Sequence, residues 1–452
     1  MCGIAGGTGT TQTYVETMLD RIRHRGPDGD GVHVCGDVTH GHVRLSLVDL
    51  SIAASQPFKT SKSAIAFNGE IWNWRELKKQ LKGKYQSHSD TEVLLRILDR
   101  EGLPGLNRVE GMFAFSWTSP QGESFIARDR WGEIPLYVDK TATGYLWASE
   151  RKAFEPGRQP IAVRPGWAFH VDTGKWIEWA TPLPHQPVSP NFIWAQLKAG
   201  VHKRLQADAP VCCLISGGLD SAAILTIAAH ERPDVVAFTA YASEESEDLQ
   251  SARRLCEELH VKLIEVPVSI SVEGVRKAIH AIEISSKAQV EIAALCMPLA
   301  RAIRQHGFKA CLSGEAADEL FGGYGNFQIQ SWNMKPPQLR ILRKKGWDKM
   351  ARGNFLRCNK AFMSQGVEVR LPFMEPALVA ACMESTFEDN PRAKKALKQA
   401  ARGKVPDWCI DREKQTFQHG AGSPSLIADL VADPLRFYKT ELRNLFAYLP
   451  AD

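Results

Sequence analysis

The sequence predicts an α/β protein whose two halves differ in how strands and helices alternate. Residues 1–180 contain short apolar runs separated by Gly, Asn and Asp, which indicates a β-rich domain. The second half instead alternates apolar runs with helical patterns, which is typical of a doubly wound parallel sheet covered by helices on both faces. The strands expected there are residues 211–215, 235–240, 262–266 and 310–312.

A proline-rich stretch separates the two halves. Residues 181–190 carry Pro182, Pro184, Pro187 and Pro190. Proline cannot donate to a strand ladder or continue a helix, so this stretch is expected to be a linker. The expected domains are therefore residues 1–180 and 191–452.

One helix of the first domain is marked at both ends. Residues 89–92 read SDTE, the pattern of a capping box, and apolar residues follow at helical spacing. Gly102 is the expected end of this helix.

Composition favours a folded cytoplasmic enzyme with small-molecule substrates. Hydrophobic residues make up 44% of the 452 residues, and the net charge is only +5, so neither nucleic acid nor a membrane surface is the expected partner. No apolar run approaches the roughly 18 residues of a membrane span, and the start lacks a signal-peptide pattern. Ten cysteines without a CxxC pair indicate reduced thiols.

Cys2 is the first candidate for catalysis. Removal of Met1 would leave Cys2 with a free α-amine, whose pKa of about 7.7 to 8.0 lets it accept the thiol proton without a histidine. Other motifs follow Cys2 in order. They are MCGIAG at the start, HRGPDG from His24, residues 45–49 after Arg44, FNGEIWN from Phe67 and SDTE from Ser89.

This ordered series resembles the class II glutamine amidotransferases, which implies an N-terminal-nucleophile glutaminase domain of αββα architecture. The resemblance implies that Cys2 attacks the side-chain amide of glutamine and forms a thioester. Arg44 would hold the α-carboxylate of glutamine, since its planar fork matches a carboxylate. Asn68 and the N–H of Gly69 would form the oxyanion hole, and Glu70 and Asp90 would bind the α-amino group.

A second set of candidates follows the first expected strand of the second domain. Residues 216–221 read SGGLDS between an apolar strand and a helix, so backbone N–H groups and the helix N-terminus can face phosphate oxygens. No Walker A lysine follows; the loop resembles that of the ATP pyrophosphatases, which cleave ATP to AMP and pyrophosphate. The ATP-binding residues expected here are Ile215, Ser216, Gly217, Gly218, Asp220 and Ser221.

Residues 313–324 read SGEAADELFGGY after another apolar strand, and they resemble the second signature of the asparagine synthetase family. The resemblance implies that Ser313 and Gly314 line the nucleotide site and that Glu315 is the acid nearest the reacting centre. Asp220 and Asp318 would bind Mg²⁺, which favours a few carboxylates together with phosphate oxygens.

Later segments extend the resemblance to about residue 422. Residues 366–373 read GVEVRLPF, and residues 414–422 read KQTFQHGAG. KKALKQA from Lys394 resembles the lysine-bearing helix of the family, with Lys394 as the catalytic lysine and Lys395 as the alternative.

The resemblance to glutamine-hydrolysing asparagine synthetases implies a complete reaction. ATP would adenylate the β-carboxylate of aspartate, and ammonia from Cys2 would pass between the domains and displace AMP. A homodimer is compatible with this family. Two positions depart from it: Ala316 replaces a glycine, and Glu291 falls where an arginine helps to hold aspartate, with Lys287 nearby.

Because of Glu291, the same chemistry on another carboxylic acid stays open as the alternative function. Retention of Cys2 argues against a β-lactam synthetase, and the chain shows no zinc ligands or RNA-binding module for a transfer-RNA modifier. The basic stretch of residues 340–360 is expected to be a solvated helix face.

Overall fold

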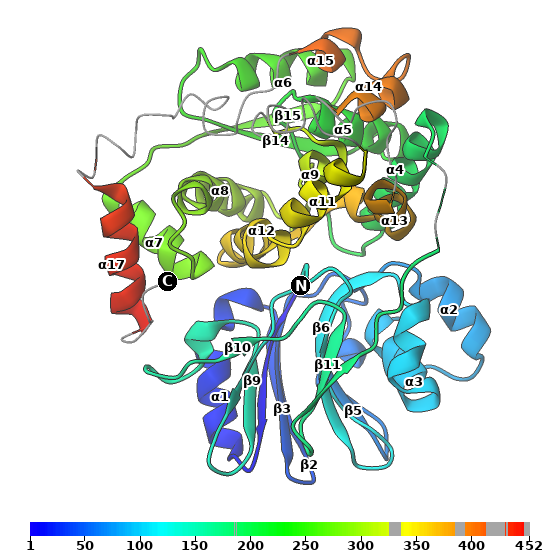
Figure 1. Cartoon of the computed structure of the whole chain (residues 1–452), viewed down its shortest axis with the longest axis vertical. Helices are drawn as coiled ribbons and strands as arrows, with labels where there is room; N and C mark the ends of the chain where they lie inside the picture. The colour runs from blue at the N-terminus through cyan, green and yellow to red at the C-terminus, as the bar shows by residue number, and fades with distance from the viewer. Residues whose placement is uncertain are drawn as a thin grey trace.

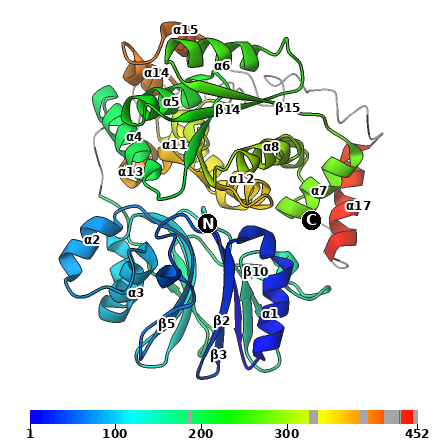
Figure 2. The ribbon, with the colours of Figure 1, turned by 180° about the vertical axis from the view of Figure 1, so that it is seen from behind.

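The computed structural model describes residues 1–184, 186, 188–324, 336–384, 394–412, 430 and 433–446. Two domains lie one above the other in Figure 1, a strand-rich one holding the N-terminal residues and one in which helices surround a parallel sheet. The N-terminus lies between the two domains in both Figure 1 and Figure 2.

The N-terminal domain is built from two antiparallel sheets of six strands each, in the orders β10-β8-β9-β1-β3-β2 and β12-β11-β7-β6-β5-β4. Contacts of β1 and β3 with β5 bring the two sheets face to face. The strands are β1 (Gly3–Thr8), β2 (Gly29–Cys35), β3 (Val38–Arg44), β4 (Phe58–Lys59), β5 (Ala64–Ile71), β6 (Gly111–Thr118), β7 (Ser124–Arg128), β8 (Tyr137–Lys140), β9 (Tyr145–Ala148), β10 (Ile161–Ala162), β11 (Trp167–His170) and β12 (Lys175–Glu178).

Helices cover the outer faces of both sheets. The helix α1 (Gln12–Arg21) packs on β1 and β3, whereas α3 (Asp90–Glu101) packs on β5 beside α2 (Trp74–Leu81). Strand β5 alternates accordingly, because Ile65 and Phe67 join the core under α3 while Asn68 points to the opposite side and reaches Cys2. The expected αββα architecture is confirmed.

The helix α3 begins and ends where the sequence predicts, but its cap differs from the expected box. Ser89 accepts the N–H of Thr91, and Gly102 ends the helix at φ 64°. Glu92 does not return to Ser89; it accepts the N–H groups of Gln86 and Ser87 instead. The capping-box prediction is therefore half correct, because the preceding turn offers Glu92 closer donors.

The second domain contains a five-stranded parallel sheet in the order β15-β14-β13-β16-β17. Its strands are β13 (Val211–Leu214), β14 (Val236–Tyr241), β15 (Lys262–Pro267), β16 (Ala310–Leu312) and β17 (Glu368–Arg370). Four of them were predicted. The strand β17 was not, because it has three residues and its buried members Glu368 and Arg370 are charged, which hides the apolar signal of a strand.

Helices surround this sheet, and α4 follows directly from the proline-rich stretch. Pro190 is the first residue of α4 rather than the end of the linker, and its missing N–H is harmless at that position. The described helices are α4 (Pro190–Leu205), α5 (Leu219–Glu231), α6 (Glu247–Glu258), α7 (Val272–Ile282), α8 (Lys287–Gln305), α9 (Ala317–Phe321), α11 (Pro336–Trp347), α12 (Asn354–Met363), α13 (Pro376–Glu384), α14 (Lys395–Ala401), α15 (Asp407–Asp411) and α17 (Pro434–Phe446).

The sheet order places a switch point between β13 and β16. From β13 the chain builds outward through β14 and β15, and then returns to add β16 and β17 on the other side. Ligands of open α/β sheets bind at the carboxyl ends of the strands at such a point. The two predicted nucleotide loops follow β13 and β16, so they lie side by side there.

Candidate functional sites

Cys2 lies immediately before β1 in a buried position at the domain junction, with 8% of its surface exposed. Its N–H donates to Oδ1 of Asn68 at 2.9 Å, and its Sγ lies 3.5 Å from the N–H of Leu45. Arg25 of the HRGPDG motif donates to the carbonyl of Cys2 at 2.8 Å. Burial raises the pKa of the Cys2 thiol, and the nearby N-terminal ammonium opposes that shift. The thiol therefore depends on a base beside it.

Met1 is buried beside Cys2 and contacts the second domain. Its side chain and ammonium are buried, and the ammonium pairs with Glu368 of β17 in the second domain. Its Sδ lies 2.9 Å from Nδ2 of Asn359. While Met1 is present, the nitrogen of Cys2 is an amide and cannot act as a base. Removal of Met1 converts that nitrogen to an amine at the same place.

Three buried carboxylates lie close together here, and one of them pairs with the Met1 ammonium. Glu70 and Asp90, the predicted ligands of the α-amino group of glutamine, are both buried, and Glu368 joins them from β17. Burial, followed by the charge of Glu368, raises the pKa of Glu70 well above its ordinary value. Arg370 lies 3.4 Å from Glu70 and also bonds Glu368. The Met1 ammonium thus pairs with Glu368 and interacts with the charge of Glu70.

Asn68 and Gly69 occupy adjacent positions on β5. The amide of Asn68 bridges the N–H of Cys2 and Oγ of Ser149, with its Nδ2 3.3 Å from that oxygen. Gly69 has no room for a side chain, since a Cβ would lie 2.1 Å from the carbonyl oxygen of Met112. The structure thus brings Cys2, Asn68 and Gly69 together, and adds Ser149, which no sequence motif indicated.

Arg44 ends β3 and orders the loop that follows. Its guanidinium donates to the carbonyl oxygens of Asp49 at 2.5 Å and Ser51 at 2.9 Å. Asp49 in turn accepts the N–H of His88, just before α3. Arg44 therefore orders the loop that follows β3 through backbone contacts, and these contacts hold its guanidinium beside that loop.

The nucleotide loop after β13 is tightly folded. Oγ of Ser221 accepts the N–H of Ser216 at 3.2 Å and donates to the carbonyl of Gly218. Gly217 has φ 66°, and a Cβ there would lie 2.2 Å from Ser251, so only glycine fits. Ile215 is buried below the loop. Arg412 also donates to the carbonyl of Ser216, a contact that the sequence did not indicate.

The loop after β16 touches the first loop. A Cβ on Gly314 would lie 2.9 Å from Cβ of Asp220, which places Ser313 and Gly314 against the nucleotide loop as predicted. Ala316 adopts φ 76°, a left-handed conformation that costs about 1 to 2 kcal/mol for a residue other than glycine. The replacement of the family's glycine therefore carries a backbone penalty.

Asp220 and Asp318 face a common cation. Lys394 pairs with Asp220, and its Nζ lies 2.7 Å from Oδ1 of Asp318. The two carboxylates raise the pKa of the buried Lys394 above its ordinary value, although burial opposes them. Lys395 begins α14 and is exposed. Of the two lysines that the sequence left open, Lys394 is the one placed at the loops.

Glu315 belongs to a polar cluster beside this site. It pairs with Arg357, and Nδ2 of Asn354 lies 3.0 Å from both Glu315 and Glu319. Burial, followed by the charge of Glu315, raises the pKa of Glu319 to about 7. Gln289 of α8 donates to Asn354 at 2.9 Å, so this side chain of α8 reaches the cluster, as does Cys296, which interacts with Arg357 and Glu315.

Glu291 takes a different direction from α8. Its carboxylate lies 3.9 Å from Nζ of Lys287, and its other neighbour is the buried Tyr438 of α17. Burial raises the pKa of Glu291, while Lys287 and the Tyr438 hydroxyl oppose that shift. Residues two apart on a helix point about 200° from each other, which separates Glu291 from Gln289.

The predicted motif of residues 414–422 lies outside the described part of the chain.

Comparison with known proteins covers both halves of the chain. The glutamine amidotransferase domain family matches residues 1–164, and the asparagine synthase family matches residues 193–352 and 342–448. The chain is 28% identical to "Asparagine synthetase [glutamine-hydrolyzing] 2" of Oryza sativa subsp. japonica, over 93% of this chain and 78% of that protein. It is 29% identical to "Asparagine synthetase [glutamine-hydrolyzing] 1" of Arabidopsis thaliana, over the same shares.

Among solved structures, a glutamine phosphoribosylpyrophosphate amidotransferase from B. subtilis has a TM-score of 0.37 and 19% identity, covering 60% of this chain and 69% of that one. An NMN synthetase from Francisella tularensis has a TM-score of 0.27 and 13% identity, covering 57% of this chain and 93% of that one. Likenesses this low add nothing to the fold described above. None of the helices in the described part of the chain is long and apolar enough to cross a membrane.

Proposed function

Since the chain belongs to the asparagine synthase family and carries a glutamine amidotransferase domain, it is an ATP-dependent ligase that uses glutamine, and we propose that it is a glutamine-dependent asparagine synthetase. Its proposed domains are residues 1–180 and 191–452, with the linker between them. The observation that carries the proposal is the position of Lys394 between Asp220 and Asp318. These aspartates lie in the first turns of α5 and α9, at the switch point of the sheet.

The glutaminase half would work from Cys2. Once Met1 is removed, the amine of Cys2 accepts the thiol proton, and the thiolate attacks the side-chain amide of glutamine. The α-amino group of glutamine would pair with Glu70 and Asp90, and its α-carboxylate would meet Arg44. Asn68 and the N–H of Gly69 would donate to the oxygen that becomes negative. The adduct then collapses: its C–N bond breaks, the Cys2 ammonium returns the proton to the leaving nitrogen, and ammonia is released at the domain junction as the thioester forms. Water then cleaves the thioester, which gives glutamate and the free thiol.

The synthetase half would activate a carboxylate with ATP. The carboxylate attacks the α-phosphorus of ATP, an acyl-adenylate forms, and pyrophosphate leaves. The loop of Ser216, Gly217, Gly218 and Ser221 would face the phosphates with its N–H groups, and Lys394 would offset the charge on the leaving pyrophosphate. Asp220 and Asp318 fit Mg²⁺ because the two carboxylates converge on one cation, the ammonium of Lys394. A bound Mg²⁺ would neutralise charge on the phosphates.

Ammonia would complete the reaction by attacking the acyl carbon, which forms the amide and releases AMP. Glu315 lies beside this centre and is held by Arg357 and Asn354. Glu315 would orient the attacking ammonia and accept its proton.

Aspartate is the proposed acceptor, and another carboxylic acid is the second candidate. The observation that favours the second is that α8 carries Glu291 where the family has an arginine for aspartate, and Glu291 lies beside Tyr438 of α17 rather than in the cluster of Glu315. A carboxylate, Glu291, therefore stands at the position where an arginine would bind the α-carboxylate of aspartate.

The test is pyrophosphate release from ATP, measured with glutamine and Mg²⁺ against a panel of carboxylic acids that includes aspartate, glutamate, β-alanine and diamino acids. The proposal expects aspartate to give the highest kcat/KM and asparagine to be the product. Turnover that favours another acid by about tenfold or more would assign the second function.

A further inference from the structure

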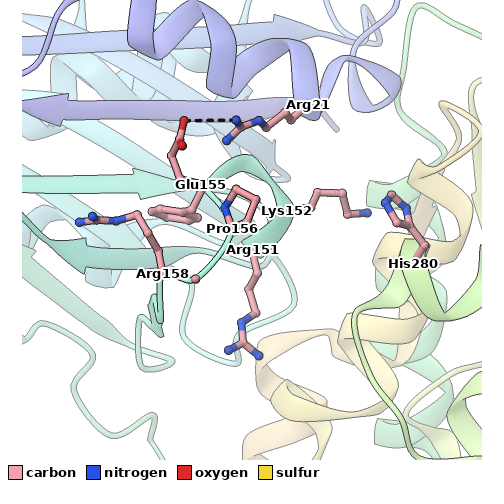
Figure 3. Close-up of a pocket in the computed structure, with 9 residues that line it drawn as sticks. Arg21, Arg151, Lys152, Glu155, Pro156, Arg158 and His280 are labelled. Atoms are coloured by element: carbon pink, nitrogen blue, oxygen red, sulfur yellow. Dashed lines mark hydrogen bonds and ion pairs between the residues drawn. The ribbon is translucent and has the colours of Figure 1, made fainter. Parts of the chain in front are cut away.

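Polar contacts join the two domains at two separate places. At the first, Glu283 accepts the N–H groups of Arg151 and Lys152 beside a cavity of about 170 Å³ (Figure 3). At the second, Lys309, which directly precedes β16, pairs with Asp28 of the HRGPDG motif. This second contact lies next to the peptide that meets the thiol of the nucleophile.

Asp28 holds the backbone on both sides of Leu45. Its own N–H donates to the carbonyl of Arg44 at 2.9 Å, and its Oδ2 accepts the N–H of Ser46 at 2.9 Å. Between these two contacts, the N–H of Leu45 points to Sγ of Cys2 at 3.5 Å. The position of the N–H that faces the thiol therefore depends on Asp28.

Lys309 binds the same oxygen of Asp28 from the second domain. Its Nζ lies 2.6 Å from Oδ2 of Asp28 and 3.4 Å from the carbonyl oxygen of Ser46, so one ammonium contacts both the carboxylate and the residue that the carboxylate holds. The side chains of Lys309 and Asp28 are 24% and 19% exposed, so salt and water screen this pair less than a surface pair.

The carboxylate of Asp28 is ionised at neutral pH. Burial raises the pKa of Asp28, but Lys309, the N–H of Ser46 and Arg304 together lower it more, so that the pKa lies below its ordinary value. Arg304 of α8 lies 3.3 Å from the other oxygen, Oδ1. The hydrogen bond from Ser46 to Asp28 is therefore assisted by charge, which makes it stronger than a neutral one.

Lys309 stands at the amino end of β16, opposite the nucleotide loop. Its carbonyl accepts the N–H of Glu368 at 2.8 Å, where β17 begins, and Glu368 pairs with the Met1 ammonium. The three residues of β16 separate Lys309 from Ser313, a span of roughly 13 Å. One edge of the sheet thus contacts the glutaminase half, and the other carries the nucleotide loops.

We propose that Lys309 of the second domain is a positioning residue for the Cys2 thiol of the first domain. It acts through Asp28 and the Ser46 carbonyl, and these hold the N–H of Leu45 against the sulfur. An N–H held there stabilises the thiolate, because a hydrogen bond to the charged form of a group favours that form. The inference rests on the proposed glutaminase role of Cys2 and adds a residue of the other domain to that site.

The first test is the kinetics of Lys309→Met in the full chain, since methionine has a similar length but no charge. The kcat of glutamine hydrolysis should fall at least tenfold, whereas KM for glutamine should change less than threefold, because Lys309 supports the thiol and not the groups proposed to bind glutamine. Amide formation from ammonium chloride should stay within twofold of the wild type. Lys309→Arg, which keeps the charge, should recover at least a third of the wild-type kcat.

Lys277→Met is the matched control, because Lys277 is an exposed lysine of α7, and it should behave like the wild type in both reactions. Equal loss of the glutamine-dependent and ammonia-dependent reactions in Lys309→Met would show that Lys309 only supports the sheet, and would overturn the proposal. A loss confined to KM for glutamine would overturn it as well.

A double-mutant cycle tests the path through Asp28. Asp28→Asn should also lower the kcat of glutamine hydrolysis, and adding Lys309→Met to it should lower kcat by less than threefold more, because the contact is already weakened. Losses that multiply as if the two residues were independent would contradict this path.

Alkylation of Cys2 by iodoacetamide needs no glutamine, so it separates this proposal from the proposed function. The modified residue is identified by the mass of the N-terminal peptide, with Cys2→Ala as the blank. Lys309→Met should slow the alkylation at pH 7 at least threefold and move its pH profile upward by at least half a unit. The charged groups that act on the thiol, namely the N-terminal amine, Glu70 and Glu368, are the same in this variant.

An unchanged alkylation profile would overturn the positioning role of Lys309 even in a chain that hydrolyses glutamine. A shifted profile in a chain that hydrolyses no glutamine would support that role and contradict the proposed function instead.

Discussion

Nζ of Lys394 lies 2.7 Å from Oδ1 of Asp318 and also pairs with Asp220. The lysine is buried and has φ 59°, a left-handed conformation that is uncommon for such a residue. Two aspartates, in the first turns of α5 and α9, thus converge on one cation. Without a cation between them, their like charges would repel strongly in this partly buried place. Lys394 therefore offsets the charges of both aspartates.

Lys394→Met should lower the rate of pyrophosphate release by about 100-fold or more, because it removes the charge that offsets the leaving phosphates. Glutaminase activity should stay near that of the wild type. Lys395→Met is the matched control, since Lys395 is exposed on α14, and should change little. If Lys395→Met showed the larger loss, the assignment of the lysine would be reversed.

Asp220→Asn and Asp318→Asn should each raise the Mg²⁺ concentration that half-saturates pyrophosphate release, and should lower the maximal rate by about 100-fold. Each removes one charge from the proposed metal site while keeping its shape. Asp234→Asn, an exposed residue of the turn before β14, serves as the control. A variant with an unaltered Mg²⁺ dependence would show that its aspartate does not meet the ion.

Asp90 gives a prediction about pH. Burial raises the pKa of Asp90 to about 6, so the carboxylate is ionised above that pH and protonated below it. If Asp90 pairs with the ammonium of glutamine, kcat/KM for glutamine should fall as the pH drops through about 6. Asp90→Asn should lose this step and lower kcat/KM about tenfold or more at pH 8, as expected for a lost hydrogen bond to a charged group.

Asp20→Asn, exposed on α1, should keep the wild-type profile. The pH dependence is best measured as glutamate formation with the second half-reaction idle. A step near pH 6 that persists in Asp90→Asn would belong to another group and would remove Asp90 from the site.

Gln289 and Glu291 lie on different faces of α8, so variants of each test which face contacts the acceptor. Gln289→Ala should raise KM for the acceptor, because Gln289 holds Asn354 and so the cluster of Glu315. Glu291→Arg should leave that KM unchanged and lower the melting temperature by a few degrees, since it places a cation beside Lys287 under α17. The reverse pattern in steady-state kinetics would show that Glu291 faces the acceptor.

The sequence motifs predicted those residues of both sites that lie within a single short segment. Cys2 and Asn68 lie in short motifs of the first domain, and Asp220 and Asp318 in short motifs of the second. The structure places the two members of each pair close together. Glu368 and Arg370 were not predicted as site residues, although Arg370 pairs with both Glu368 and Glu70 near Cys2. Their role depends on packing between domains, and a buried ion pair in a three-residue strand has no periodic signal.

The direction of the Glu291 side chain on α8 also could not be predicted from the sequence. The position of Glu291 in α8 indicated a contact with the acceptor, but the C-terminal helix α17 packs against α7 and α8 and brings Tyr438 to it. Glu283 is similar: it is left-handed at the end of α7 and binds N–H groups of the other domain. These contacts join segments that are far apart in the sequence, within one domain for Tyr438 and between the domains for Glu283, so no local pattern encodes them.

The division of labour between the two domains is tested most directly by Cys2→Ala. Cys35→Ala, on β2, is the matched control. Amide formation should be measured with glutamine and, separately, with ammonium chloride as the nitrogen source. Cys2→Ala should lose the glutamine-dependent reaction and keep the ammonia-dependent one near the wild-type rate. Equal loss of both reactions in a folded protein would contradict the account.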